Sequence, residues 1–297
     1  MRVTQNMLSN TILNNISASY GRIEKYQAQL ASGKINRRPS DDPAAVNKSL
    51  SFRSSVKEIE QYARNVDDSI TWLSTADVSM RNATELMYRA KELAVMGANG
   101  TLGQSELNKI ANEVDSIVAD MVNIGNANVA GRYIFSGQRT TTAPFTQVSA
   151  PAPAVNYNGD GNTIDYDIGK GATIKVNLAG NTVFKGATDV FQVLLDLGAH
   201  LRAGNFASVS ASTSLIDNAL DAITDSLAVV GARLNRLDFA NDRHMEDSLN
   251  LTEILSSVED ADFAEVVVRL KAEENVYQSA LMTGSMSIQK SLIDFLR

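Results

Sequence analysis

Residues 40–97 read SDDPAAVNKSLSFRSSVKEIEQYARNVDDSITWLSTADVSMRNATELMYRAKELAVMG, and the strongest periodic pattern of the chain lies within them. Apolar residues recur in it at every seventh position. They are Phe52, Ile59, Val66, Leu73, Met80, Met87 and Ala94. A heptad repeat sustained over this length, with no proline inside it, predicts one long helix that packs along a coiled-coil-like seam.

The start of this helix and the end of the one before it carry clear signals. Ser32 and Gly33 are expected to end a first, shorter helix, because glycine is favoured just past a helix terminus. The long helix is expected to begin at Pro43, which loses nothing by lacking an N–H at a first helical position. Asp41 and Asp42 resemble paired catalytic carboxylates, but helix capping explains them more simply.

Downstream of the long helix, the pattern predicts a third helix and then a change of architecture. Apolar residues from Leu107 to Ile124 keep helical spacing, and residues 132–137 are expected to form a short strand leading into a turn. Proline and glycine become frequent after residue 138, and the alternating runs 163–167 and 173–177 predict strands joined by glycine turns. Residues 190–197 are expected to form a short returning helix.

Heptad spacing returns near residue 216 and continues to the end of the chain. The predicted fold class is therefore mainly α with a small β-rich inserted domain, in which amino- and carboxyl-terminal heptad helices pair in a coiled-coil-like bundle. Each terminal segment carries one apolar stripe without a neighbour close in sequence, so each is expected to pair with the other end and with copies of the same chain. The stripe residues predicted to make these contacts are Leu13, Ile16, Ile23, Leu30, Leu281, Ile288 and Phe295.

Charge supports this pairing of the two ends. Residues 1–39 carry six basic residues and one acidic residue, whereas residues 259–297 carry seven acidic and four basic residues. Opposite net charges favour association, although exposed pairs contribute little individually. The whole chain has a net charge of −7, which argues against general binding to nucleic acid or to anionic membranes.

Composition also excludes several kinds of chemistry. The chain has no cysteine, no apolar run long enough to span a membrane and no cleavable secretory signal pattern. His200 and His244 lack framing acidic motifs, and no phosphate-binding glycine loop or nucleophile elbow is present. Residues 158–162 open like a calcium loop, but Gly169 stands where the bidentate glutamate belongs, so a turn is expected there. We therefore expect neither an enzyme nor a cofactor or metal site.

Several motifs together resemble the flagellin superfamily. Residues 1–7, 30–36 (LASGKIN) and 39–44 (PSDDPA) are similar to the segment that joins the first two helices in that family. Residues 131–137, 157–160, 177–184, 276–281 and 291–296 resemble its hook–filament junction branch, the hook-associated protein 3 family. The resemblance covers 1–137 and about 215–297 well and the middle of the chain weakly.

The resemblance implies an elongated rod with both termini at one end. Three domains are expected: 1–35 with 262–297, 36–137 with 205–261, and the β-rich insertion 138–204. It also implies self-assembly in the extracellular flagellum, with hook-associated protein 1, flagellin, an export chaperone and a type III export channel as partners. Flagellin itself remains an alternative, as does an extracellular coiled-coil adhesin or scaffold.

Overall fold

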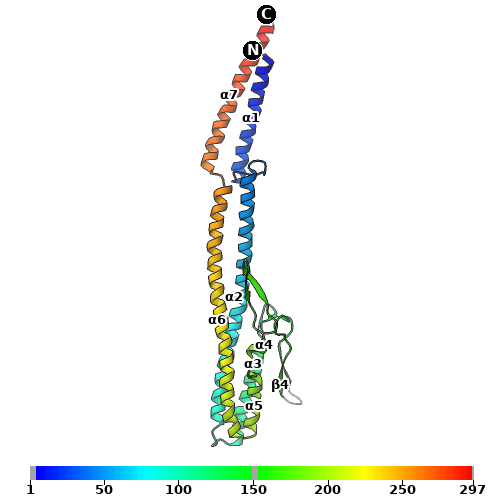
Figure 1. Ribbon diagram of the computed structural model, residues 1–297, viewed down its shortest axis with the longest axis vertical. Helices are drawn as coiled ribbons and strands as arrows, with labels where there is room; N and C mark the ends of the chain where they lie inside the picture. Colours follow the sequence, from blue (N-terminus) through cyan, green and yellow to red (C-terminus); the bar gives the residue numbers. More distant parts are fainter. Residues whose placement is uncertain (1–4, 149–152, 296–297) are drawn as a thin grey trace. The chain divides into compact units, whose positions relative to one another are not determined.

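The computed structural model describes residues 5–148 and 153–295, and most of these lie in helices (Figure 1). The helices are α1 (Gln5–Ser32), α2 (Pro43–Gly97), α3 (Gln104–Gly125), α4 (Gly180–Val183), α5 (Val190–Arg202), α6 (Phe206–Glu259) and α7 (Phe263–Phe295). The strands are β1 (Asn128–Val129), β2 (Arg132–Tyr133), β3 (Phe145–Val148), β4 (Ala154–Tyr157), β5 (Asp165–Gly169) and β6 (Ala172–Lys175). The mainly helical fold class with a small strand-containing region is thus confirmed.

The chain packs as two compact units. Met1–Glu58 and Asp247–Arg297 form the smaller unit, and Ile59–Glu246 form the larger one. Helices α2 and α6 each contribute residues to both units. The division into three domains expected from the resemblance stays a prediction.

The predicted heptad seam forms the centre of the larger unit. Val66, Leu73, Met80 and Met87 of α2 are fully buried, as the seven-residue spacing requires. Helix α3 adds its own three-four row, from Leu107 through Val114 to Met121, and α6 adds the row Ile216, Ile223, Val230 and Leu237. Burial of these rows provides most of the driving force for folding of this unit, because apolar area removed from water stabilises by about 25 cal/mol per Å².

Three two-stranded hairpins and α5 make up the region after α3. The hairpins are β1–β2, β3–β4 and β5–β6, each antiparallel. Helix α5 is longer than expected and packs against α3 (Figure 1), so the region shares the helical core. Four aromatic rings fill the space between these elements; they belong to Phe135, Phe145, Phe184 and Phe191.

Three predicted strands need correction. Of residues 132–137, only Arg132 and Tyr133 pair as a strand, because Ile134 and Phe135 turn into the core and are fully buried. The predicted strands 163–167 and 173–177 exist but are displaced to Asp165–Gly169 and Ala172–Lys175. Asn177 explains the end of pairing there, since its side chain bonds the backbone of Asn162 and Ile164 in place of a ladder contact.

Hydrogen bonds from helix side chains fasten the β5–β6 hairpin. The His244 Nε2 lies 2.8 Å from the Ile168 carbonyl oxygen, and the Asn65 amide donates to the Asp167 oxygen at 2.8 Å. His244 is buried and its ring stacks on Tyr62. This histidine therefore holds the hairpin to the helices, a role that its place on a weakening heptad did not indicate.

Candidate assembly surface at the paired ends

Helices α1 and α7 pack side by side in the smaller unit (Figure 1). On α1, the row Ile12, Ile16, Ser19, Ile23, Tyr26 and Leu30 alternates in steps of three and four residues, the spacing of one helix face. Ser19 and Ile23 are buried in the contact, and Val266 is buried on α7. The predicted pairing of the two ends is thus present within one chain.

Close approach of the two helices depends on a glycine. A Cβ atom on Gly284 of α7 would lie 3.1 Å from Ile12 Cγ2 and 3.8 Å from Ile16 Cδ1. Ile16, one of the predicted stripe residues, therefore packs against α7 at this point. The glycine carries no apolar side chain, so the apolar periodicity of the sequence does not indicate it.

Polar contacts hold the middle of the pair. The Glu273 Oε1 accepts hydrogen bonds from Ser19 Oγ at 2.7 Å and from Arg22 Nη2 at 2.6 Å. The hydrogen bonds from Arg22 and Ser19 hold the pKa of Glu273 below its ordinary value. Tyr20 and Tyr277 face each other nearby, with ring centroids 6.2 Å apart. This cluster brings opposite charges of the two ends into direct contact. Its residues were not among the contact residues predicted from the sequence.

Many apolar side chains of the pair stay exposed. Leu13 and Leu281, both predicted contact residues, are 58% and 44% exposed. A second apolar line on α7, formed by Val268, Met282 and Met286, is 68–69% exposed and lies on a different face from Val266 and Gly284, which meet α1. Ile288 and Phe295 belong to α7, but their side chains lie outside the part that the structure describes.

Two linkers adjoin the pair: residues 33–42 join α1 to α2, and residues 260–262 join α6 to α7. Backbone hydrogen bonds hold the first linker to the second linker and to the end of α6. Gly33 has a φ of 70°. This angle lets the chain leave α1 in the left-handed conformation that glycine favours. The Gly33 carbonyl oxygen accepts from the Ala261 N–H, and the Ile35 N–H donates to the Glu259 oxygen, both at 2.8 Å. Ser32 closes the last turn of α1, since its hydroxyl donates to the Ala28 oxygen.

Glu259 is the buried charge of this junction, 6% exposed. Its carboxylate pairs with Arg53 of α2, from Nε at 2.9 Å, and with Lys34 of the linker. Burial acts to raise the pKa of Glu259, but the hydrogen bonds from Arg53 and Lys34 outweigh it, and the pKa lies below its ordinary value. One carboxylate at the end of α6 thus connects the linker after α1 to α2.

The two aspartates before α2 play different roles. Asp42 caps the helix as expected, because its Oδ1 accepts from the Ala44 and Ala45 N–H groups at 3.0 Å. Asp41 is not a helix cap, and that prediction was wrong. Its carboxylate accepts from the Arg37 and Arg38 N–H groups and closes a turn of the linker. Only the residue directly before Pro43 is placed to reach the free donors of the first helical turn.

Neither a membrane span nor a metal cluster emerges from the described residues. No helix among them is long and apolar enough to cross a bilayer. Within 5–148 and 153–295, no three or more acidic or histidine side chains gather in a way that could hold a metal ion. In the loop 158–162, Asp160 Oδ1 instead accepts the Gln138 N–H at 2.7 Å.

The fold defines a mainly helical protein in which the first and last helices, α1 and α7, pack together, and comparisons with known proteins agree. The model of the bacterial flagellin N-terminal helical region matches residues 3–140, and that of the C-terminal helical region matches residues 213–296. The chain belongs to the bacterial flagellin family. This membership favours the flagellar interpretation over a coiled-coil adhesin.

Individual relatives are similar over nearly the whole chain. Flagellar hook-associated protein 3 of Escherichia coli K12 is 22% identical over 94% of this chain and 95% of its own. Flagellin of Bacillus subtilis is 25% identical over 89% of this chain and 88% of its own. A solved structure from Vibrio parahaemolyticus, described as a flagellar hook-associated protein, aligns with a TM-score of 0.68 at 26% identity and covers 74% of this chain and all of its own.

Proposed function

We propose that this chain is a structural subunit of the junction between the flagellar hook and filament. It assembles with other copies through the exposed apolar residues of α1 and α7. The observation that carries the proposal is the second apolar line of α7, formed by Val268, Met282 and Met286, which α1 leaves uncovered. Exposed apolar groups that lie together mark interaction sites in soluble proteins.

Assembly follows from the balance between burial and conformational entropy. Among the side chains that the structure describes, the α1/α7 pair buries few apolar ones, so a free copy gains little to offset the entropy lost when both helices become ordered. Neighbouring copies supply the missing apolar contacts. The paired ends are therefore expected to be loosely held in the monomer and fully ordered in the assembly.

The names of the relatives support the location and the partners. We place the chain outside the cell, where it contacts hook-associated protein 1 on the hook side and flagellin on the filament side. An export chaperone and the flagellar type III channel deliver it, without cleavage of a signal peptide. In this role the protein acts by binding its neighbours and catalyses no reaction.

The test compares two aspartate substitutions on the same turn of α7. Met282→Asp places a charge on the second apolar line, whereas Thr283→Asp places the same charge on the neighbouring polar position. We expect Met282→Asp to abolish incorporation into flagella and motility, because a charge cannot be buried unpaired at low cost. Thr283→Asp should retain both. Equal incorporation of the two variants would contradict the proposal.

Ile23→Asp and Ile288→Asp, the substitutions suggested by the stripes alone, are expected to block incorporation too. Ile23 is buried within the contact between α1 and α7. Its replacement would open the pair inside one copy, so loss of assembly would not isolate the contact between copies. Met282 is therefore the sharper position.

A filament subunit is the second candidate, and the similarity to flagellin of Bacillus subtilis favours it. The two roles differ in what the purified chain does by itself. A filament subunit should polymerise into long filaments when seeded with its own fragments. A junction subunit should stay unpolymerised until hook ends that carry the hook-side protein are added. Electron microscopy of both mixtures separates the two candidates.

A further inference from the structure

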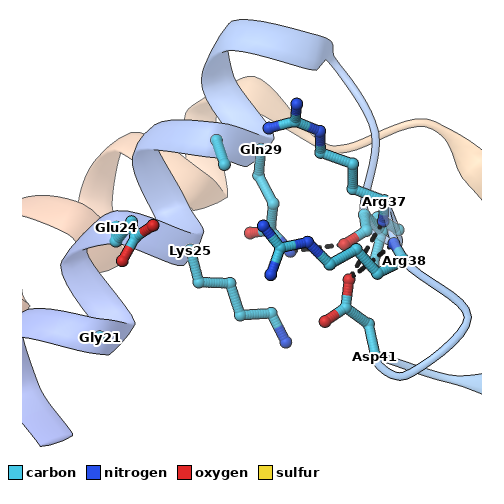
Figure 2. Close-up of a pocket in the computed structure, with 9 residues that line it drawn as sticks. Gly21, Glu24, Lys25, Gln29, Arg37, Arg38 and Asp41 are labelled. Atoms are coloured by element: carbon cyan, nitrogen blue, oxygen red, sulfur yellow. Dashed lines mark hydrogen bonds between the residues drawn. The ribbon is translucent and has the colours of Figure 1, made fainter.

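A recess of about 290 Å³ lies between α1 and the linker 33–42 (Figure 2). Two contacts fix the linker that forms its wall. The Gln29 side-chain amide, itself buried, donates to the Ile35 carbonyl oxygen at 2.7 Å. The Asp41 carboxylate accepts from the Arg37 and Arg38 N–H groups at 3.2 and 3.0 Å. The recess is therefore a built feature of the linker.

Cationic side chains dominate this recess. Lys25, Arg37 and Arg38 line it, and in Figure 2 the side chains of Lys25 and Arg38 extend into the space beside the Asp41 carboxylate. None of these three forms an ion pair with another described residue. Glu24 and Asp41 are the carboxylates of the lining, so one positive charge is left in excess.

Asp41 is already engaged by the linker. Its hydrogen bond from the Arg38 N–H, together with that from Arg37, lowers its pKa below the ordinary value. Ile35 adds an apolar wall that is 41% exposed. Guanidinium and ammonium groups beside an apolar side chain suit a partner that offers carboxylates and a hydrophobic group together.

Helix α6 presents this combination on one exposed face. Asp238, Asp242 and Glu246 follow one another at intervals of four residues, which places them on one side of the helix. We name these three residues the acidic ladder. None of the three forms an ion pair with any residue that the structure describes. Phe239, beside the ladder, is 76% exposed.

The basic residue within the ladder segment does not neutralise it. Arg243 extends toward Gly169 of β5, since its Nη2 lies 3.3 Å from where a Cβ of Gly169 would stand. The ladder therefore keeps its negative charge on the outside. The recess and the ladder thus carry opposite net charges. Each also has one exposed apolar side chain beside its charged groups.

We propose that the recess binds the acidic ladder of a second copy of this chain. The inference rests on the proposed self-assembly and adds to it a specific contact, separate from the apolar residues of α1 and α7. Each copy carries one recess and one ladder, so the contact is heterologous. Heterologous contacts build rings or open helical arrays instead of closed two-fold dimers, as a flagellar axial structure requires.

Because the chain has no cysteine, introduced cysteines report the contact directly. Full-length Arg38→Cys and Asp242→Cys copies are mixed in equal amounts with hook ends that carry the hook-side protein, oxidised and separated on a non-reducing gel. Association of the copies on these hook ends is followed by electron microscopy of the same mixture. The matched control replaces Asp242→Cys with Asp221→Cys, an exposed acidic position of α6 outside the ladder.

We expect the Arg38→Cys/Asp242→Cys mixture to give at least about fivefold more cross-linked pair than the control, and higher salt to reduce the difference. Copies that associate yet cross-link no better than the control overturn the ladder contact and leave self-assembly intact. Copies that never associate, even with the hook ends present, overturn both proposals. The contact between copies is also overturned if a single chain that carries both substitutions forms an intramolecular disulfide at high dilution.

Charge reversal provides the second readout. Arg38→Glu should weaken self-association, and the compensating Asp242→Arg on the partner copy should restore it. Restoration supports the contact. If the reversed pair associates no better than Arg38→Glu with the unaltered ladder, the two side chains do not meet.

Discussion

The aromatic core of the larger unit and the α1/α7 pair are held together by different means. In the core, the ring centroid of Phe145 lies 4.9 Å from that of Phe191 and 5.7 Å from that of Phe184, and all three rings are fully buried. The pair buries Ile23 and Val266 around a polar centre and leaves many apolar residues exposed. One region is thus complete within a single chain, whereas the other keeps exposed apolar side chains that we propose neighbouring copies cover.

The strongest test of this comparison is Phe145→Ala. Loss of a buried ring that contacts three others, those of Tyr157, Phe184 and Phe191, should lower the free energy of unfolding of the larger unit by about 3–5 kcal/mol. Trp72, the single tryptophan, lies in this unit, so its fluorescence during urea unfolding reports the change. Phe239→Ala removes an exposed ring of the same size and should change stability by less than about 0.5 kcal/mol. Equal midpoints for the two variants would mean that the aromatic cluster does not stabilise this unit.

A smaller effect is expected at the junction next to the pair. Glu259→Gln removes the charge that Arg53 and Lys34 share and should cost roughly 1–3 kcal/mol of local stability. The amide protons of Ile35 and Ala261, which hydrogen-bond across the two linkers, should then exchange faster. Glu253→Gln, an exposed position of the same helix, is the control and should leave both exchange rates unchanged.

Lowering the pH should weaken the junction as Glu259→Gln does, because it protonates the same carboxylate. The pKa of Glu259 is lower in the folded protein than in an unfolded chain. Its stabilisation is therefore fully present above the unfolded value of about 4.3 and is lost as the pH falls through the folded pKa. Protection of the Ile35 and Ala261 amides should fall in this acidic range in the natural protein. Glu259→Gln should abolish that part of the pH dependence, and an unchanged pH profile in the variant would exclude Glu259 as its source.

The helical architecture could be predicted because heptad spacing is a local signal repeated many times. Val66, Leu73, Met80 and Met87 are buried where the period places them. The β1–β2 hairpin could not be predicted this way. Its turn is Ala130–Gly131, with φ angles of 50° and 79°. Alanine gives none of the usual Asn-Gly signal of such a turn, so tertiary context imposes the conformation there.

The candidate surface was only partly visible in the sequence, for a physical reason. Apolar periodicity identifies Ile16 and Ile23, but it cannot detect contacts that depend on small or polar groups. Gly284 allows close approach because it lacks a side chain, and Glu259 acts through partners at positions 34 and 53. Such partnerships are set by the three-dimensional arrangement, and a single sequence carries no signal of them.

The smallest expected effect separates the charges that join the helices from those on a helix surface. Lys271 pairs with Glu274 on α7 alone, and its side chain is 72% exposed. Because such a pair stabilises a helix only weakly, Lys271→Ala should cost no more than about 0.5 kcal/mol.

Arg22→Ala is the matched variant, since the partner of Arg22, Glu273, lies on the other helix of the pair. It should loosen α7 more than Lys271→Ala does, because it removes a hydrogen-bonded contact between the helices. Amide exchange along α7 measures both. If Lys271→Ala loosened α7 as much as Arg22→Ala, helix propensity alone would hold α7 in place, and the contact with α1 would add nothing to its stability.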